Sequence, residues 1–322
     1  MVFKTKVAAT GLMAAALIVM PGGVSCCRGP SGDDGADVEC ARNDQLPPLD
    51  VPQYEEWPFD ENEAKRRQEE TAARLGVSVE GRVRLKDQLC LDLVLVPTGR
   101  FIMGFQGSEG NEPHEARVSR PFYIGKYEVT WRQYAAFPQS KGAHLTNLGL
   151  DNARKGSRGE LDWAVDGIEW VTCNRYCRDV SKALGCAARL PRELEWEYAC
   201  RAGTTGRFVW GETRDSLYTD GHRPEGAAWE LIERTNTIGL LRPNPWGIHD
   251  MIGNAGEWVC DEYNDDPWSR TIRGESGLDR DGFAARYPGI KTGTGPYVGF
   301  RMVFEIDAAL VSLLKQNHTL VR

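Results

Sequence analysis

Hydrophobic residues are spaced in different ways along the 322 residues of the chain. A nearly unbroken apolar run, Val7 to Met20, is followed by residues 28–57, which are rich in Gly, Asp and Pro and show no periodicity. Residues 60–75 predict a short polar helix, with Asp60 as its N-cap and Gly76 past its end. The rest of the chain alternates polar and apolar positions in short stretches, which predicts a folded body behind a solvated tether.

The body predicts a mixture of short strands and helices. Strands are expected at four short apolar stretches: 84–85, 89–96, 101–103 and 122–124. Helical spacing covers 130–137, 173–184 and 194–201, with Thr130 and Thr172 as candidate N-caps. After Gly203, closely spaced glycines leave no room for long regular elements. We therefore expect an irregular α+β domain with little regular secondary structure and with large aromatic residues, Trp196 and Tyr198 among them, in its core.

The N-terminal apolar run predicts an export signal, residues 1–25. Lys4 and Lys6 precede the run, which is too short to span a membrane as a helix, and small residues follow it. Two cleavages fit these residues. An ordinary signal peptidase would cut after Ser25 and release the protein, whereas cleavage at an imperfect lipobox would leave Cys26 lipidated. We expect an exported protein, either secreted or a lipoprotein of the cell envelope; the alternative is that the run forms a buried core helix.

Charge and cysteine content narrow the function classes. The chain has 46 Asp and Glu against 39 Lys and Arg, a net charge of −7, which argues against nucleic-acid binding because that binding depends on cationic neutralisation. In an exported protein, several of the nine cysteines can form disulfides, and buried free thiols are the alternative. The candidates are Cys40, Cys90, Cys173, Cys177, Cys186, Cys200 and Cys260.

Five motifs in a fixed order carry a family resemblance. They are Phe101-Ile102-Met103-Gly104, Pro121 to Thr130 (PFYIGKYEVT), Arg189 to Ala199 (RLPRELEWEYA), Asn244 to Trp258 (NPWGIHDMIGNAGEW) and Gly299-Phe300-Arg301. Together they resemble the formylglycine-generating enzyme (sulfatase-modifying factor) family, over about Leu85 to Glu305. The resemblance implies a variant of the C-type-lectin fold for residues 83–305, between a tether with a short helix at 26–82 and a C-terminal tail at 306–322.

The resemblance also implies where copper chemistry would lie. Enzymes of the family oxidise a cysteine of a sulfatase to formylglycine with copper held by two cysteines, because thiolates suit Cu(I). Anchored on the triplet Ala284-Ala285-Arg286, the two cysteine positions hold Leu278 and Phe283. No cysteine follows Cys260, so realignment cannot restore the pair. Copper is therefore not expected in this chain.

A calcium site is the second implication of the resemblance. The family's site would use the side chains of Asp250 and Glu257 and the carbonyls of Gly253 and Ala255, which are oxygen ligands of the kind that calcium prefers. The alternative is that Glu257 only accepts hydrogen bonds in a tight turn. A further calcium site of the family expects an Asn near residues 227–229, where the chain has none.

Two functions follow. In the first, the chain is an exported, non-oxidase binding or accessory module that recognises a protein or glycan outside the cytoplasm through the region between Arg273 and Tyr297, with Trp268, Arg286 and Tyr287 as contact residues. It would bind no nucleic acid and would meet the membrane only through a lipid anchor. In the alternative, it is a divergent enzyme of the same family that carries out an oxidative modification with other ligands. A structural lipoprotein without any ligand is a third reading.

Overall fold

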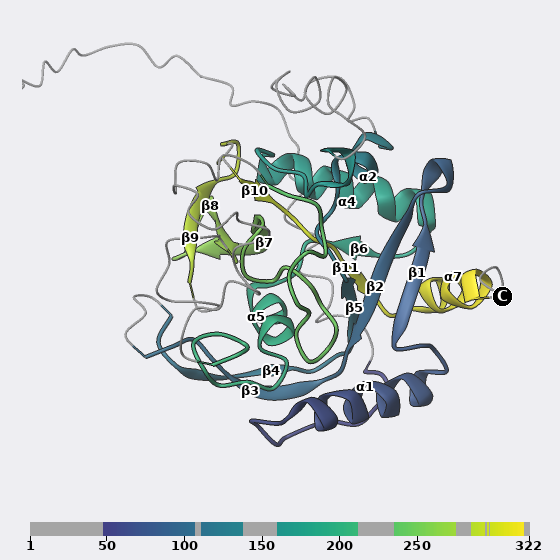
Figure 1. The fold of residues 1–322 in the computed structure, drawn as a ribbon, viewed down its shortest axis with the longest axis vertical. Coiled ribbons are helices and arrows are strands. Elements are labelled where there is room, and N and C mark those ends of the chain that lie inside the picture. Colours follow the sequence, from purple (N-terminus) through teal and green to yellow (C-terminus); the bar gives the residue numbers. More distant parts are fainter. Residues whose placement is uncertain are drawn as a thin grey trace, which may run out of the picture. The chain divides into compact units, whose positions relative to one another are not determined.

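Three sheets organise the part of the chain that the computed structural model describes, residues 48–106, 111–137, 160–211, 235–274, 285–293, 295 and 297–318 (Figure 1). All of these residues belong to one unit, residues 34–322. The expected export signal, Cys26 and the two cysteine positions at Leu278 and Phe283 lie outside the described residues. None of the helices within the described ranges combines the length and the hydropathy that crossing a bilayer requires.

The largest sheet joins strands from both ends of the sequence. Its order is β1-β2-β5-β11-β6, and every neighbouring pair is antiparallel. The strands are β1 (Glu80–Arg84), β2 (Cys90–Val96), β5 (Phe122–Gly125), β11 (Val303–Glu305) and β6 (Ala188–Arg189). Because β11 lies between β5 and β6, the strand that follows Gly299-Phe300-Arg301 in the sequence is inserted inside the sheet. The strands expected at 89–96 and 122–124 are found here, whereas the strand expected at 84–85 shares only Arg84 with β1.

A four-stranded sheet follows Gly203, where the sequence predicted mostly turns and no long regular elements. Its order is β10-β7-β8-β9, with β10 parallel to β7. The strands are β7 (Gly256–Tyr263), β8 (Asp266–Arg273), β9 (Tyr287–Ile290) and β10 (Val298–Gly299). Asn264 and Asp265, both at positive φ, form the tight turn between β7 and β8, which suits the twist of a hairpin. The prediction that this region has no long regular elements is wrong, because a two-residue turn pairs two strands of eight residues each.

A ribbon and five α-helices complete the described part. The ribbon pairs β3 (Gly99–Met103) with β4 (His114–Val118). The α-helices are α1 (Glu61–Leu75), α2 (Trp131–Ala135), α4 (Trp170–Leu184), α5 (Glu193–Arg201) and α7 (Ala308–His318), and single 3-10 turns lie at η2 (Lys86–Gln88) and η3 (Glu160–Asp162). Asp60 caps α1 through its side chain, and Thr130 forms a capping box at α2, as expected. The prediction that Thr172 caps α4 is wrong, because the helix already begins at Trp170 with Glu169 as its N-cap.

The core is aromatic, as the sequence predicts, and consists of two clusters, one of which includes α5. Trp196 and Tyr198 of α5 are fully buried and pack with Trp246 and Phe101 in one cluster. The other cluster centres on α4, where Tyr176 stacks on Tyr134 and meets the edge of Phe300.

Segments outside residues 83–305 also take part in the packing. In α1, Gln68 is buried and donates to the carbonyls of Leu95 and Trp246, at 2.8 and 3.2 Å. At the other end, α7 packs on β1, and Leu310 and Leu314 are buried in the larger core cluster (Figure 1). The segments interpreted from sequence as tether and tail therefore contain helices that belong to the fold.

Candidate functional site

The turn that precedes β7 contains the residues for which calcium was predicted. Asp250 and Asn254 both have φ of 58°, and Gly253 has φ of 100°, so three residues shortly before Glu257 have positive φ angles. The Asp250 carboxylate is buried and accepts hydrogen bonds from the backbone N–H groups of Gly239 and Leu241. Asp250 thereby fixes the preceding loop against the turn.

Glu257 is fully buried at the start of β7 and is paired with Arg301. Arg301 Nε lies 2.8 and 2.7 Å from the two oxygens of the Glu257 carboxylate, and Nη2 lies 2.6 Å from Oε1. Trp196 Nε1 donates to Oε2 of the same carboxylate at 2.8 Å. Burial by itself would lower the pKa of Arg301, but the charge of Glu257 raises it, so the guanidinium is charged. Both oxygens of Glu257 thus serve an internal ion pair.

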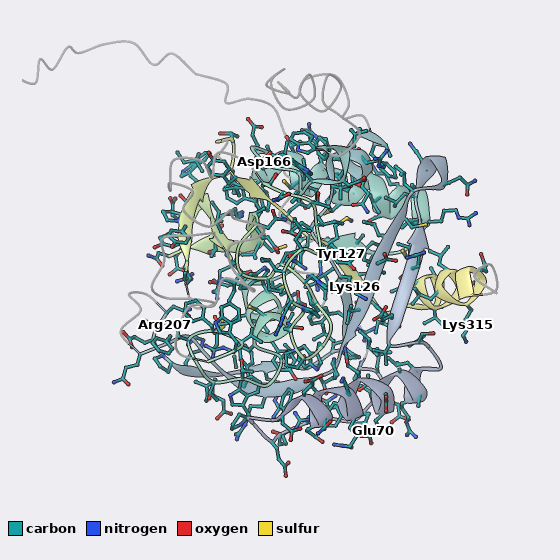
Figure 2. The ribbon with its side chains drawn as sticks, in the orientation of Figure 1. Glu70, Lys126, Tyr127, Asp166, Arg207 and Lys315 are labelled. Atoms are coloured by element: carbon teal, nitrogen blue, oxygen red, sulfur yellow. The ribbon has the colours of Figure 1, made fainter. Side chains whose placement is uncertain are left out.

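A third buried carboxyl, Glu128, lies beside this pair. Its Oε1 accepts from Asn254 Nδ2 at 2.9 Å, whereas Oε2 has no hydrogen-bond partner among the described residues. Burial, together with the charge of Asp250, raises the pKa of Glu128 well above its ordinary value. Burial also raises the pKa of Asp250, against the opposing effect of the two amides that it accepts from. The neighbouring Tyr127, labelled in Figure 2, packs on His249 with ring centroids 5.0 Å apart.

These side chains do not fit a calcium ion in their present arrangement. Calcium binds six to eight oxygens, usually including charged carboxylates that are not already neutralised. Here Glu257 is bound by a guanidinium and an indole N–H, and Asp250 is bound by two amides. Within the described ranges, no group of three or more His, Cys, Asp and Glu side chains is placed to hold a metal. Glu257 accepts hydrogen bonds in a tight turn, as the alternative to a calcium site described. Calcium binding by the chain stays a prediction.

The three predicted contact residues lie in two different environments. Trp268 on β8 is 76% exposed and Ile290 on β9 is 65% exposed. Ile290 is paired with Ser269, and Lys291 N donates to Trp268 O at 3.0 Å, so the side chains of Trp268 and Ile290 point to opposite faces of the sheet. Tyr287 is half-buried and is paired with Ile272. The structure therefore does not gather the three residues into one patch.

The Arg286 guanidinium forms ion pairs within the molecule and is not an exposed contact residue. Its Nε and Nη2 donate to the two carboxylate oxygens of Glu193 at 2.5 and 3.0 Å, and its guanidinium lies over the ring of Tyr263. Arg273 donates to the same Glu193, at 2.6 Å. Arg286 thus lies at the outer end of a network of buried ion pairs.

This network of ion pairs was not predicted from the sequence. Arg273 bridges Glu193 to Glu197, and Arg201 pairs with Glu197 at 2.7 Å. Burial would raise the pKa of Glu197, but the charges of Arg273 and Arg201 lower it below its ordinary value. The three α5 residues, Glu193, Glu197 and Arg201, are four positions apart and so face the same way along the helix, and this spacing is the signal that could have found them.

The described thiols decide between the two alternatives for five of the candidate cysteines. Five described cysteines are thiols: Cys90, Cys173, Cys177, Cys186 and Cys200. All of them except the half-buried Cys90 are buried, and burial raises the pKa of Cys173 well above its ordinary value and that of Cys186 to about 12. Disulfides among these five are therefore excluded. Cys260, by contrast, is disulfide-bonded, as an exported protein allows.

Known proteins are similar to this chain in sequence. A family model, the Sulfatase-modifying factor enzyme 1-like domain, matches residues 82–306. Inactive C-alpha-formylglycine-generating enzyme 2 of Bos taurus is 26% identical over 239 residues, 59% of this chain and 77% of the relative. Formylglycine-generating enzyme of Streptomyces coelicolor is 28% identical over 266 residues, 60% and 81% of the two chains.

Two solved structures have a similar fold. The Treponema denticola variable protein 1 superposes with a TM-score of 0.57 at 18% identity, covering 71% of this chain and 99% of that one. PvdO from Pseudomonas aeruginosa gives 0.54 at 22% identity, covering 70% and 98%. The predicted irregular α+β fold is confirmed. Because the family model spans most of the chain, this protein belongs to the sulfatase-modifying factor, or formylglycine-generating enzyme, family.

Proposed function

We propose that this chain is an exported binding or accessory module of the family and does not carry out its copper-dependent oxidation. The observation that carries the proposal is the placement of sulfur. Copper(I) in this chemistry needs two accessible thiolates, and no cysteine follows Cys260 in the sequence. Cys260 is itself in a disulfide, and four of the five described thiols are buried. The disulfide also supports export, because such bonds persist in oxidising compartments.

The relatives support a non-oxidase role without deciding it. Two of them, from Bos taurus and Mus musculus, are named inactive C-alpha-formylglycine-generating enzyme 2, and they match this chain over 59% and 58% of its length. Others carry the name of the enzyme itself. Since members of both kinds share the fold, activity depends on the residues that each member places at the site.

The surface that best suits a partner is the exposed end of β8 and β9, which carries Trp268 on one face and Ile290 on the other and which we call the β8–β9 patch. β8 is hydrogen-bonded to β7 on one side and to β9 on the other, so both side chains are held by paired strands. An exposed tryptophan is typical of residues that a partner covers, and Ile290 adds a second exposed apolar side chain at the same end of the sheet. Strand addition to β9 is hindered, because Pro288 lacks an N–H and the Ile290 carbonyl already accepts from Gly293. The partner, a protein or a glycan outside the cytoplasm, would therefore contact side chains.

The oxidase question is tested by copper and oxygen measurements on the full-length exported protein. Anaerobic titration with Cu(I) against a colorimetric chelator measures binding, and an oxygen electrode measures turnover with a cysteine-containing peptide. We expect no more Cu(I) binding than in the Cys90→Ser variant and no peptide-dependent oxygen consumption. The Streptomyces coelicolor enzyme serves as the positive control. Stoichiometric Cu(I) binding with peptide-dependent oxygen consumption would overturn the proposal.

The β8–β9 patch is tested by paired substitutions. Trp268→Ser combined with Ile290→Ser removes both exposed apolar side chains, whereas Ile102→Ser removes a side chain that is 42% exposed on β3, away from the patch. Cross-linking in the intact envelope followed by mass spectrometry identifies the species bound to each variant. A species lost in the double variant and retained in Ile102→Ser is the expected result. Equal recovery from both variants would place the partner elsewhere.

A further inference from the structure

The Arg301 guanidinium is surrounded by four oxygens from three separate segments. Two are the carboxylate oxygens of Glu257, at 2.6 to 2.8 Å from its nitrogens. The others are backbone carbonyls: Gly125 O accepts from Nη1 at 3.0 Å, and His249 O accepts from Nη2 at 3.1 Å. Arg301 is fully buried, so its guanidinium is shielded from bulk solvent. One side chain thus joins the end of β5, the turn before β7 and the first residues of β7.

These oxygens are the donor types that a hard cation takes. Calcium is bound by carboxylates, mono- or bidentate, together with inward-facing backbone carbonyls. Glu257 supplies the bidentate carboxylate here, and Gly125 and His249 supply the carbonyls. All four oxygens face a group that carries its own positive charge and is part of the chain. A divalent ion bound to the same carboxylate would have to lie next to the guanidinium, and the two positive charges would repel each other.

We infer that Arg301 acts as a built-in cation, taking the place of a bound divalent ion at the turn formed by residues 250–257, so that this chain holds the turn without a metal. The inference goes beyond the proposed binding function and does not depend on it. The surrounding charges agree with it. Trp196 saturates the second oxygen of Glu257, and the remaining acid next to the turn, Glu128, is already bonded through Oε1 to Asn254.

The experiment compares the wild-type protein with the Arg301→Met variant in millimolar calcium chloride and in a chelator. Thermal unfolding followed by circular dichroism gives the midpoint in each condition. The wild type is expected to have the same midpoint in both. Arg301→Met leaves the Glu257 carboxylate and the two carbonyls without a cation, so its midpoint should fall in the chelator and rise by several degrees when calcium is added.

A matched control separates calcium binding at this turn from a general effect of calcium on a weakened protein. Arg201 is another buried arginine paired with a glutamate, but its partner Glu197 is also held by Arg273. Arg201→Met therefore removes a buried ion pair without leaving an unpaired carboxylate. It should be destabilised, and calcium should not restore it.

Each outcome decides the inference. A wild-type midpoint that rises with calcium overturns it, because the unmodified turn would then bind the ion. A folded Arg301→Met variant that ignores calcium also overturns it, and so does an equal calcium response in Arg201→Met. If Arg301→Met does not fold, refolding from urea with and without calcium replaces the melting experiment. Soluble, folded protein recovered only with calcium supports the inference, and no recovery in either buffer refutes it.

Discussion

Asp261 allows a quantitative test of the electrostatics of this fold. It lies in β7, where its carboxylate accepts the N–H of Glu193 at 2.5 Å and so binds the first turn of α5. Burial raises the pKa of Asp261 from 3.8 to about 6, and the charges of Glu193 and Glu195 add to the rise, while the hydrogen bond and Arg192 oppose it. The folded protein therefore holds the proton of Asp261 more tightly than the unfolded chain does.

The size and sign of the effect follow from linkage. Each whole number in pKa corresponds to about 1.4 kcal/mol, so the rise from 3.8 to about 6 amounts to roughly 3 kcal/mol of unfolding free energy. For an acid whose pKa is raised by folding, this contribution is fully present below the unfolded pKa of 3.8. It is lost as the pH rises to about 6, where the folded protein must also ionise. At neutral pH the wild type therefore carries the full cost of the buried charge.

The substitution Asp261→Asn removes this cost, because an amide is neutral at every pH and its carbonyl can still accept the N–H of Glu193. Urea unfolding of both proteins, with the disulfide intact and across a series of pH values, gives the difference in unfolding free energy. We expect the difference to be close to zero near pH 4 and to grow to roughly 3 kcal/mol in favour of the variant above about pH 6.

The comparison with a second variant makes the result decisive. Asp265→Asn makes the same change of residue type at an exposed position in the β7–β8 turn, at a positive φ that asparagine tolerates, and serves as the matched control. If the difference for Asp261→Asn is the same at all pH values, or if the variant is the less stable protein at neutral pH, then the carboxylate is not held in a desolvated position and the reasoning fails.

Two other predictions concern packing and sulfur. In Gly299→Ala, the new Cβ would lie 1.9 Å from the carbonyl oxygen of Val165, so urea unfolding should show a loss of at least about 2 kcal/mol. Gly167→Ala, which meets no atom within 4 Å but keeps a φ of 65°, should lose only about 1 kcal/mol, and equal losses would contradict the backbone clash. Iodoacetamide applied to the native protein should label Cys90 rapidly and the four buried thiols slowly, as read by peptide mass spectrometry; equal rates would show that the buried thiols are accessible.

Local signals predicted the local parts of the fold. The cap at Asp60 and the capping box at Thr130 depend on residues within one helical turn, so the sequence contains all that they need. The strands β7 and β8 were missed because their glycine-rich surroundings favour turns, whereas their stability comes from pairing with each other and with β9 and β10. Pairing of this kind depends on tertiary contacts that composition does not contain.

The candidate site was predictable only in part for the same reason. The residues at 250–257 were identified from the resemblance, but the partner that decides their chemistry, Arg301, lies 44 positions from Glu257. Likewise Arg286 was expected at a surface and is bound to Glu193, 93 positions away. Sequence reasoning named the correct segments and could not see which charges the fold brings together.

The buried charges explain why the family signature survives without the copper cysteines. In the signature RLPRELEWEYA, Arg189 holds Glu195 through two hydrogen bonds of 2.7 and 2.8 Å and also pairs with Glu305 of β11. Glu193 and Glu197 bind Arg273 of β8. Removing one member of a buried pair costs about 3 to 5 kcal/mol, a large part of the stability of a domain, so these residues have a role in folding that does not depend on copper.

The two cysteine positions and the ion pairs that hold α5 to the sheets can therefore change independently of each other. The two cysteine positions at Leu278 and Phe283 lie in the sequence between β8 and β9, and neither takes part in the ion pairs that join α5 to the two larger sheets. A substitution at those two positions leaves all of those pairs in place. A match to the signature therefore shows the fold of a chain and by itself does not decide whether the chain oxidises a substrate.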